Sequence, residues 1–335
     1  MIPQTHALDT KQAWQIALAN TIKDPKELLS QLGLEDKLQT IAADVLKKFP
    51  LRVPQNYVNK MQFGDENDPL LRQVFPLIDE ALVVDNFVSD PVGDHLAISS
   101  PGILQKYHGR ALLVTTGACA IHCRYCFRRH FPYGESNPLA GQWQQTLNTL
   151  TNDKSINEVI LSGGDPLVIT DNKLESMVKD LEKIPHLKRL RIHTRLPIVL
   201  PERVDQYLVE WIKSTRLQVI IVVHANHANE IDSEVADALD ALRSANCQLF
   251  NQSVLLKGIN DTSDDLIQLS ERLSDVSVTP YYLHLLDPVA GASHFDVPEH
   301  IAIDLIEKIR TKLPGYLVPR LVREQQGKAS KTSIS

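Results

Sequence analysis

The chain has 335 residues, of which 43% are hydrophobic and 23% charged, an ordinary composition for a folded globular protein. Its formal net charge of −6 and the lack of a long basic run argue against nucleic acid or an anionic membrane as main partner. The N-terminus has no signal-like segment, and no apolar run approaches the roughly 20 residues of a spanning helix, so we expect a cytoplasmic protein without a membrane anchor.

The first hundred residues predict an α-rich N-terminal region. Apolar side chains such as Trp14, Ile16 and Leu28 recur at helical spacing between residues 11 and 49. Residues 49–101 contain six prolines, which favour short helices and extended connections over regular sheet. We therefore expect residues 1–100 to form a scaffold that packs against the rest of the chain.

Residues 101–335 alternate strand-like and amphipathic helical segments. The predicted strands are 111–116, 158–162, 189–193, 218–224, 249–255 and 278–285, and the predicted helices are 142–150, 173–184, 204–213, 233–245, 264–273 and 301–313. A strand followed by a helix, repeated six times, predicts parallel βα units in an α/β fold. A partial (β/α)6-type barrel is the simplest solution, and a doubly wound sheet would give the same pattern. In a barrel, chemistry lies at the C-terminal ends of the strands.

Three of the four cysteines follow directly after the first predicted strand. Cys119, Cys123 and Cys126 have the spacing C-x3-C-x2-C, one thiolate short of a closed zinc site or a fully ligated iron-sulfur cube. The motif resembles that of the radical S-adenosylmethionine (SAM) superfamily. That resemblance implies a [4Fe-4S] cluster as metal site, whose open iron binds SAM and whose electron cleaves it to a 5'-deoxyadenosyl radical.

The cysteine spacing alone leaves other metal sites open. His122 or His130 could complete a Cys3His zinc site, Cys247 could supply a distant fourth thiolate, or the thiols could be unliganded. A non-catalytic zinc or electron-transfer module is therefore an alternative. Three clustered cysteines and one distant cysteine do not suggest a set of disulfide bonds. This pattern is typical of a protein in the reducing cytoplasm.

A glycine pair ends the second predicted strand, in the run Ser162, Gly163, Gly164 and Asp165. Paired glycines let a backbone approach a ligand closely, although an ordinary βα turn would have the same composition. One βα unit after the cysteines, the run resembles the glycine-rich SAM-binding element of the superfamily. The resemblance implies that these four residues bind SAM.

Longer runs narrow the resemblance to one family. Residues 67–74, 90–94, 162–167, 195–201 and 251–256 are similar to the lysine 2,3-aminomutase family, and the similarity extends from about residue 50 to the end. The family implies an isomerase that uses the cluster, SAM and pyridoxal 5'-phosphate (PLP) to convert (S)-α-lysine to (R)-β-lysine.

The sequence of residues 319–324 and the short C-terminus are most similar to the branch of the family that supplies β-lysine for elongation factor P. This implies L-lysine as substrate, an external electron donor, and a functional link to elongation factor P and its lysyl ligase. The sequence is compatible with a homo-oligomer. Two alternative functions stay open. The protein could be a lysine 2,3-aminomutase that serves another β-lysine pathway, or a radical SAM enzyme that does not use PLP.

The family resemblance also implies where PLP binds. Its covalent anchor corresponds to Lys331, a dozen residues after Pro319, although the family's polyglycine is here only Gly327, which leaves Lys328 as a rival. Three residues before the first strand match the family segment that holds the cofactor, with cations for the phosphate and a ring partner: Lys106, Arg110 and Tyr107. Lys106 stands where arginine is expected and lacks its bidentate fork.

Three further residues correspond to substrate ligands of the family. Arg128 would bind the lysine carboxylate, and Asp287 and Glu324 would bind the ε-ammonium, since a buried charge needs a partner. Glu324 replaces the family's usual aspartate, which adds a methylene. Without the resemblance, these acids would be expected to be a turn residue and a surface charge. Members with a longer C-terminal segment carry zinc-binding cysteines, and since only Cys247 is spare, we expect no structural zinc.

Overall fold

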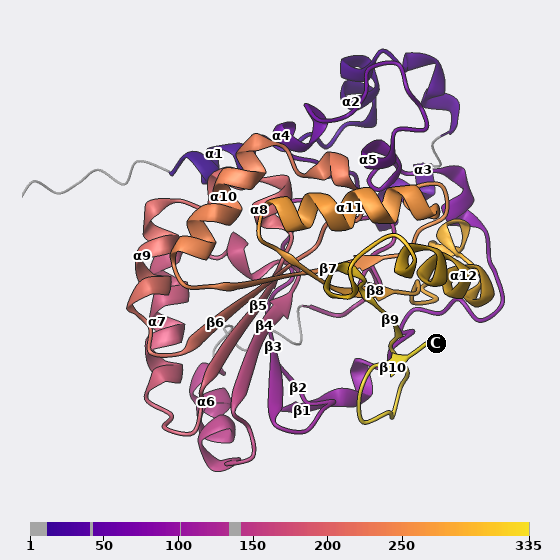
Figure 1. Ribbon diagram of the computed structural model, residues 1–335. Helices are drawn as coiled ribbons and strands as arrows, with labels where there is room; N and C mark the ends of the chain where they lie inside the picture. Colours follow the sequence, from indigo (N-terminus) through magenta and orange to yellow (C-terminus); the bar gives the residue numbers. More distant parts are fainter. Residues whose placement is uncertain (1–11, 41–42, 101, 134–141, 335) are drawn as a thin grey trace, which may run out of the picture.

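The computed structural model describes residues 12–40, 43–100, 102–133 and 142–334. Ten strands form one open sheet in sequence order, with β3 to β9 parallel and β1, β2 and β10 antiparallel to their neighbours (Figure 1). The strands are β1 Ile98–Ser100, β2 Ile103–Leu104, β3 Arg110–Thr116, β4 Glu158–Gly163, β5 Arg189–Thr194, β6 Gln218–Val223, β7 Gln248–Val254, β8 Thr279–His284, β9 Arg320–Arg323 and β10 Thr332–Ser333.

Each of the parallel strands β3 to β8 is followed by a helix that returns the chain to the next strand. These helices are α6 Trp143–Asn152, α7 Asp171–Glu182, α9 Gln206–Ser214, α10 Ser233–Ser244, α11 Ser263–Asp275 and α12 Glu299–Arg310. All six predicted strands and all six predicted helices are confirmed, with ends that differ by at most three residues. The partial (β/α)6-type barrel is therefore confirmed, with β9 as an additional parallel strand that the sequence analysis missed.

Strand β5 shows how the sheet separates core from site. Leu190 and Ile192 are fully buried among the apolar residues of the main core, whereas Arg191 and His193 alternate with them and line a cavity on the inner face. Successive side chains of a strand point to opposite faces, so this alternation follows from the pleat. Strands β4 and β6 are apolar and buried along most of their length, as expected of parallel strands covered on both faces.

The N-terminal region is α-rich, as predicted. Its α-helices are α1 Ala13–Ala19, α2 Pro25–Leu32, α3 Ala43–Lys48, α4 Gln55–Val58 and α5 Pro69–Arg72, and Trp14, Leu28 and Tyr57 belong to the same hydrophobic core as the barrel. The region ends in one short strand, β1, although its prolines favour short helices and extended connections over regular sheet; β1 and β2, which follows just beyond the region, extend the sheet upstream of β3. Strands this short give little periodic signal.

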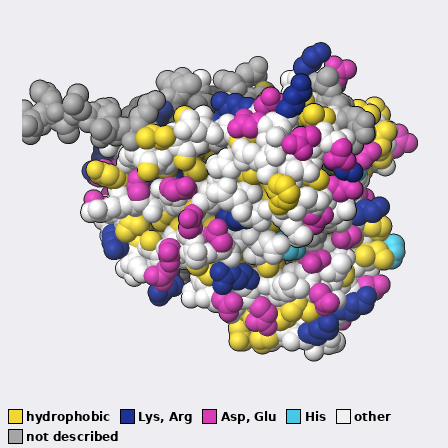
Figure 2. Space-filling view, turned by 90° about the horizontal axis from the view of Figure 1, so that it is seen from above, with side chains coloured by type: hydrophobic (Ala, Val, Ile, Leu, Met, Phe, Trp, Pro, Cys, Tyr) yellow, Lys and Arg dark blue, Asp and Glu magenta, His cyan; other side chains and the backbone are white. Residues whose placement is uncertain are grey.

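The C-terminal hairpin brings a distant part of the chain to the inner face of the barrel. Strand β10 pairs antiparallel with β9, with Thr332 opposite Arg323, and this register places Lys331 across from Glu324. Within the described residues no helix is long and apolar enough to cross a membrane. On the face seen in Figure 2, acidic and basic side chains are interspersed and form no single basic patch.

Candidate active site

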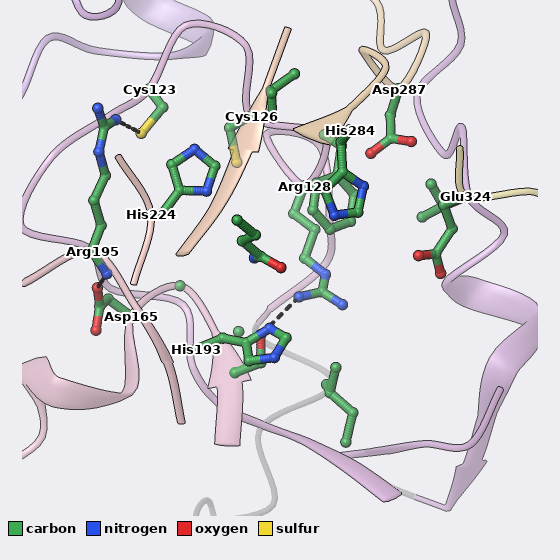
Figure 3. Close-up of a pocket in the computed structure, with 18 of the residues that line it drawn as sticks. Cys123, Cys126, Arg128, Asp165, His193, Arg195, His224, His284, Asp287 and Glu324 are labelled. Carbon is green, nitrogen blue, oxygen red and sulfur yellow. Dashed lines mark hydrogen bonds between the residues drawn. The ribbon is translucent and has the colours of Figure 1, made fainter. Parts of the chain in front are cut away.

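The inner face of the barrel encloses a cavity of about 640 Å³. Figure 3 shows that its side chains converge from several strands and from the cysteine loop. All fourteen site residues named from the sequence line it: Lys106, Tyr107, Arg110, Cys119, Cys123, Cys126, Arg128, Ser162, Gly163, Gly164, Asp165, Asp287, Glu324 and Lys331. A pocket of this size is large enough for substantial ligands.

The three cysteines are free thiols on the loop that follows β3. Burial raises the pKa of Cys126 to about 11, and the neighbouring Cys123 adds to the shift. In the described part of the chain, no three His, Cys, Asp or Glu side chains converge tightly enough to ligate one metal ion. In a [4Fe-4S] cluster each cysteine thiolate binds a different iron, so such a cluster does not require the three sulfurs to converge on one metal ion.

The side chains that could have completed a zinc site have other contacts. The Nδ1 atom of His122 lies 2.8 Å from the carbonyl of Pro50, and the Nε2 atom of His130 lies 3.2 Å from the carbonyl of Ala290. Cys247 is buried in the main hydrophobic core. Cys247 therefore lies apart from the cavity that the other three cysteines line, whereas each histidine keeps one ring nitrogen that these contacts do not engage.

Salt bridges hold the cysteine loop in place. Arg124 donates from Nε to Glu80 at 2.7 Å, and Arg129 donates from Nη2 to the same carboxylate at 2.7 Å. All three side chains are almost completely buried, and both guanidinium groups stack on the Phe49 ring. A paired and buried charge cluster of this kind fixes the loop, because a lone buried charge would be very costly.

The glycine pair lets β4 approach the cysteine loop. A Cβ atom on Gly163, whose φ is +123°, would lie 2.4 Å from the carbonyl oxygen of Thr116, and one on Gly164 would lie 2.3 Å from that of Ala118. No other residue fits at either position without moving the backbone. The turn therefore lies directly against the loop that carries the cysteines.

Asp165 has a different environment from the one the sequence suggested. Its carboxylate accepts hydrogen bonds from the Thr194 hydroxyl at 2.7 Å, the Arg195 backbone N–H at 2.7 Å and the Leu167 backbone N–H at 3.0 Å. Burial raises its pKa to about 6 despite these donors. The carboxylate thus ties the turn to the end of β5, a role that sequence spacing could not reveal.

Alternating charges connect the two sides of the cavity. Asp94 accepts from the Nε atom of Arg128 at 2.7 Å and pairs with Lys106 at 2.6 Å. Lys106 lies 3.3 Å from Glu324, which accepts from the Nζ atom of Lys331 at 2.6 Å. The sequence analysis missed Asp94, which is 1% exposed. In the sequence, Asp94 is marked only by its place in the segment 90–94, which is similar to the family. Its partners Arg128 and Lys106 lie far away along the chain.

Lys331 and Lys328 occupy different environments. The Lys331 ammonium lies inside the cavity, 5.8 Å from the centre of the Tyr282 ring, whereas Lys328 is exposed on the hairpin and does not line the cavity. Only Lys331 is therefore positioned to reach a cofactor bound among the cavity residues.

The cationic groups near the hairpin differ from those expected. Lys106 is engaged by two carboxylates, which leaves it less suited to a phosphate than we expected. Arg110 packs over the Tyr107 ring at 5.5 Å, and Arg191 and Arg320 line the same cavity. Sequence reasoning missed the last two, although the alternation along β5 could have identified Arg191.

The two acids predicted to bind the substrate, Asp287 and Glu324, lie together across the cavity from Cys123 (Figure 3). Burial raises the pKa of Asp287 to about 7, and the adjacent Glu324 adds to this effect. Burial alone would also raise the pKa of Glu324, but Lys331 and Lys106 lower it to about 2. One acid is therefore ionised throughout the physiological range, whereas the other titrates within it.

Three histidines form part of the cavity wall: His193, His224 and His284. The sequence indicated His224 as an active-site wall or strand-end residue, and it did not single out the other two. Burial lowers the pKa of all three, to about 3 for His224. The Nε2 atoms of His193 and His284 are buried and have no hydrogen-bond partner among the described residues. Neutral imidazoles of this kind can donate to or accept from a bound molecule.

Comparison with known proteins gives consistent matches. Residues 113–270 match the radical SAM superfamily. The chain is 44% identical to L-lysine 2,3-aminomutase of Escherichia coli, over 97% of its own length and 95% of the relative's. It is 45% identical to L-lysine 2,3-aminomutase of Haemophilus influenzae, over 99% and 98% of the two lengths. The enzyme of that name from Clostridium subterminale is 32% identical, over 96% and 77%.

Proposed function

The chain belongs to the lysine 2,3-aminomutase family of the radical SAM superfamily, a family of isomerases, and we propose that it moves the amino group of L-lysine from the α-carbon to the β-carbon. The observation that carries the proposal is the cavity on the inner face of the barrel. Three thiols, a buried arginine and a pair of acids line its wall, together with a lysine. These are the groups required to bind a radical source and a dibasic amino acid.

The residues fit the two cofactors of the radical step. Cys119, Cys123 and Cys126 would hold the cluster, and the Gly163–Gly164 turn, packed against their loop, would hold SAM. The backbone N–H groups of Gly164 and Asp165 donate to the carbonyl oxygens of Thr116 and Ala118, at 2.7 and 2.8 Å, so the turn would meet SAM through the close approach that glycine allows. Asp165 would act by holding this turn, through its bonds to the end of β5.

The opposite side of the cavity fits PLP. Lys331 would be its covalent anchor, and Arg110 and Arg320 offer cations for the phosphate, whereas Arg191 lines the same wall but is paired with Glu158. When bound, the cluster and SAM supply a carbon-centred radical, and PLP supplies a π-system that stabilises the rearranging substrate. The protein contributes position, charge and exclusion of water.

The substrate would lie between these two groups. Arg128 uses Nε for Asp94 and Nη1 for Ser162, at 2.7 and 3.1 Å, which fixes the plane of its guanidinium at the cavity wall. A fork held in this way can bind a carboxylate with little loss of entropy. Asp287 and Glu324 would receive the ε-ammonium, and Glu324 would exchange its bond to Lys331 for one to the substrate.

We further propose that the product is (R)-β-lysine and that it is used to modify elongation factor P. The support is the similarity of residues 319–324 to the corresponding branch of the family. The test is anaerobic incubation with iron, sulfide, SAM, PLP, dithionite and L-lysine, followed by chiral chromatography. A second reaction adds elongation factor P and its lysyl ligase, and mass spectrometry follows the modification.

The two parts of this experiment separate the two claims. β-Lysine in the first reaction supports the aminomutase activity, and rearrangement of a different amino acid instead would overturn the substrate. Enzyme-dependent modification in the second reaction supports the link to elongation factor P. Formation of β-lysine that the ligase does not use would overturn that link and leave the activity standing.

The titration of Asp287 predicts how activity depends on pH. Because the pKa of this carboxyl is raised to about 7, it becomes neutral as pH falls below 7 and can no longer pair with an ammonium. We expect kcat/KM for lysine to fall by up to about tenfold per pH unit below this point. Steady-state assays at constant ionic strength would measure this profile.

The matched control is Asp287→Asn, which removes the titrating group and leaves Asp165 unchanged. Its kcat/KM should be low and should lose the inflection near pH 7. If the variant keeps the wild-type inflection, another group is responsible and Asp287 does not pair with the substrate.

A further inference from the structure

A buried guanidinium lies against one of the cluster cysteines. Arg195, which follows β5 directly and is 6% exposed, donates from Nη1 to the Sγ atom of Cys123 at 2.6 Å. Figure 3 shows this contact on the side of the cavity away from Asp287 and Glu324. Arg195 is absent from the set of ligands described above, so its position needs a separate explanation.

The second terminal nitrogen of Arg195, Nη2, is held by a buried polar network. Nη2 donates to the Oε2 atom of Glu230 at 2.8 Å and to the Oε1 atom of Gln73 at 2.6 Å. Glu230 is fully buried and also accepts from the backbone N–H groups of Asn226 and His227, at 2.7 and 3.0 Å. The guanidinium therefore cannot turn away from Cys123 without breaking several buried hydrogen bonds, each costly to lose.

Aromatic rings enclose the same guanidinium. Its centre lies 5.5 Å from the Tyr57 ring and 5.8 Å from the Tyr125 ring. An arginine guanidinium is not deprotonated in proteins, whatever its surroundings. The positive charge is therefore permanent and shielded from water, where its effect on a nearby charge is strongest.

We propose that Arg195 is a positioning residue that donates a charge-assisted hydrogen bond to the Cys123 thiolate and thereby raises the reduction potential of the cluster bound there. One-electron reduction of a [4Fe-4S] cluster from the 2+ to the 1+ state adds one negative charge, supplied by the external donor. A cationic donor to a ligand sulfur stabilises the more negative state more strongly. This inference rests on the proposed function, because it requires the cluster at the three cysteines.

Arg195 also links the cluster to the SAM turn. Its backbone N–H donates to Asp165 at 2.7 Å, and Asp165 in turn holds the residues after the glycine pair. One residue thus contacts the thiolate through its side chain and the SAM turn through its backbone. The backbone contact would survive substitution of the side chain, so the two effects can be separated.

The test compares four reconstituted holoenzymes: wild type, Arg195→Gln, Arg195→Lys and Tyr57→Phe. Each is titrated anaerobically with dithionite, and the reduced cluster is followed by electron paramagnetic resonance. We expect Arg195→Gln to lower the equilibrium constant for cluster reduction at least tenfold. This corresponds to a fall of about 59 mV in the reduction potential of a one-electron couple. The reduction potential of Arg195→Lys should lie between those of Arg195→Gln and the wild type. Lysine keeps the positive charge but lacks the planar set of donors of the guanidinium group.

Tyr57→Phe is the matched control. It removes a hydroxyl that lies 3.3 Å from the Nη2 atom of Arg195 and leaves the cation in place, so its potential should equal that of the wild type. A wild-type potential in an Arg195→Gln protein with full iron and sulfide content would overturn the inference and leave the proposed function intact. Failure of the wild type to bind a cluster would overturn the proposed function instead.

If Arg195→Gln does not bind a cluster, a second measurement tests the hydrogen bond between Arg195 and Cys123 directly. Wild-type protein labelled with [¹⁵N]arginine is reduced, and electron spin echo modulation is recorded. We expect a weak ¹⁵N coupling to the cluster that disappears in Arg195→Lys. If the labelled wild type shows no coupling, the hydrogen bond to the thiolate is absent and the inference fails.

Discussion

Replacing Lys331 with alanine is expected to abolish the visible absorbance of protein-bound PLP and to reduce aminomutase activity by roughly 10⁴-fold or more, the scale seen when a covalent catalytic group is removed. The Nζ atom lies in the cavity beside Glu324 and faces the Tyr282 ring, so no other group on the hairpin is placed to replace it. Absorbance spectra and product formation measure the two effects.

The control for this substitution is Lys328→Ala. Lys328 is exposed on the same hairpin, only three residues away, and its removal should leave spectrum and activity near wild type. Loss of the PLP band in Lys328→Ala, with the band retained in Lys331→Ala, would reverse the assignment. If wild-type protein showed no PLP band at all, the radical SAM enzyme without PLP would become the better hypothesis.

Replacing Arg128 with glutamine should produce the second large effect. Removing one member of a buried, hydrogen-bonded charge pair costs about 2–5 kcal/mol, which corresponds to roughly 30-fold to 5,000-fold in kcat/KM for lysine. The loss is expected because the guanidinium, held by Asp94 and Ser162, would no longer meet the substrate carboxylate. Steady-state kinetics with L-lysine measure it.

Cadaverine distinguishes recognition of the carboxylate from general damage to the site, because it is lysine without that group. Binding of cadaverine, followed through changes in the PLP spectrum, should differ little between wild type and Arg128→Gln, whereas binding of L-lysine should weaken greatly. Equal weakening for both compounds would show that Arg128 supports the cavity without contacting the carboxylate.

The order of strands and helices was predictable because it depends on local periodicity. The alternation at β5, the apolar runs of β4 and β6, and the amphipathic helices each leave a signal within one segment. The short strands β1, β2, β9 and β10 were missed because two to four residues carry too little of a repeat. Their pairing depends on the tertiary structure, as Lys331 opposite Glu324 illustrates.

The candidate site shows the same division. The cysteines and the glycine pair each fall within a short segment of the sequence and could be recognised as motifs. The family resemblance added Arg128, Asp287 and Lys331. Partners that meet only in the fold were not predicted. Asp94 reaches Arg128 from 34 residues away, and Arg195 reaches Cys123 from 72 residues away. Such pairs leave no spacing that a single sequence can reveal.

The most direct test of the account follows a hydrogen atom. The holoenzyme is incubated anaerobically with SAM, dithionite and L-lysine deuterated at the β-carbon, and SAM and its cleavage product are analysed by mass spectrometry. Deuterium is expected in both the 5'-deoxyadenosyl group and the β-lysine formed. β-Lysine produced without any deuterium in the adenosyl group would contradict it, since no radical would then have passed between SAM and the substrate.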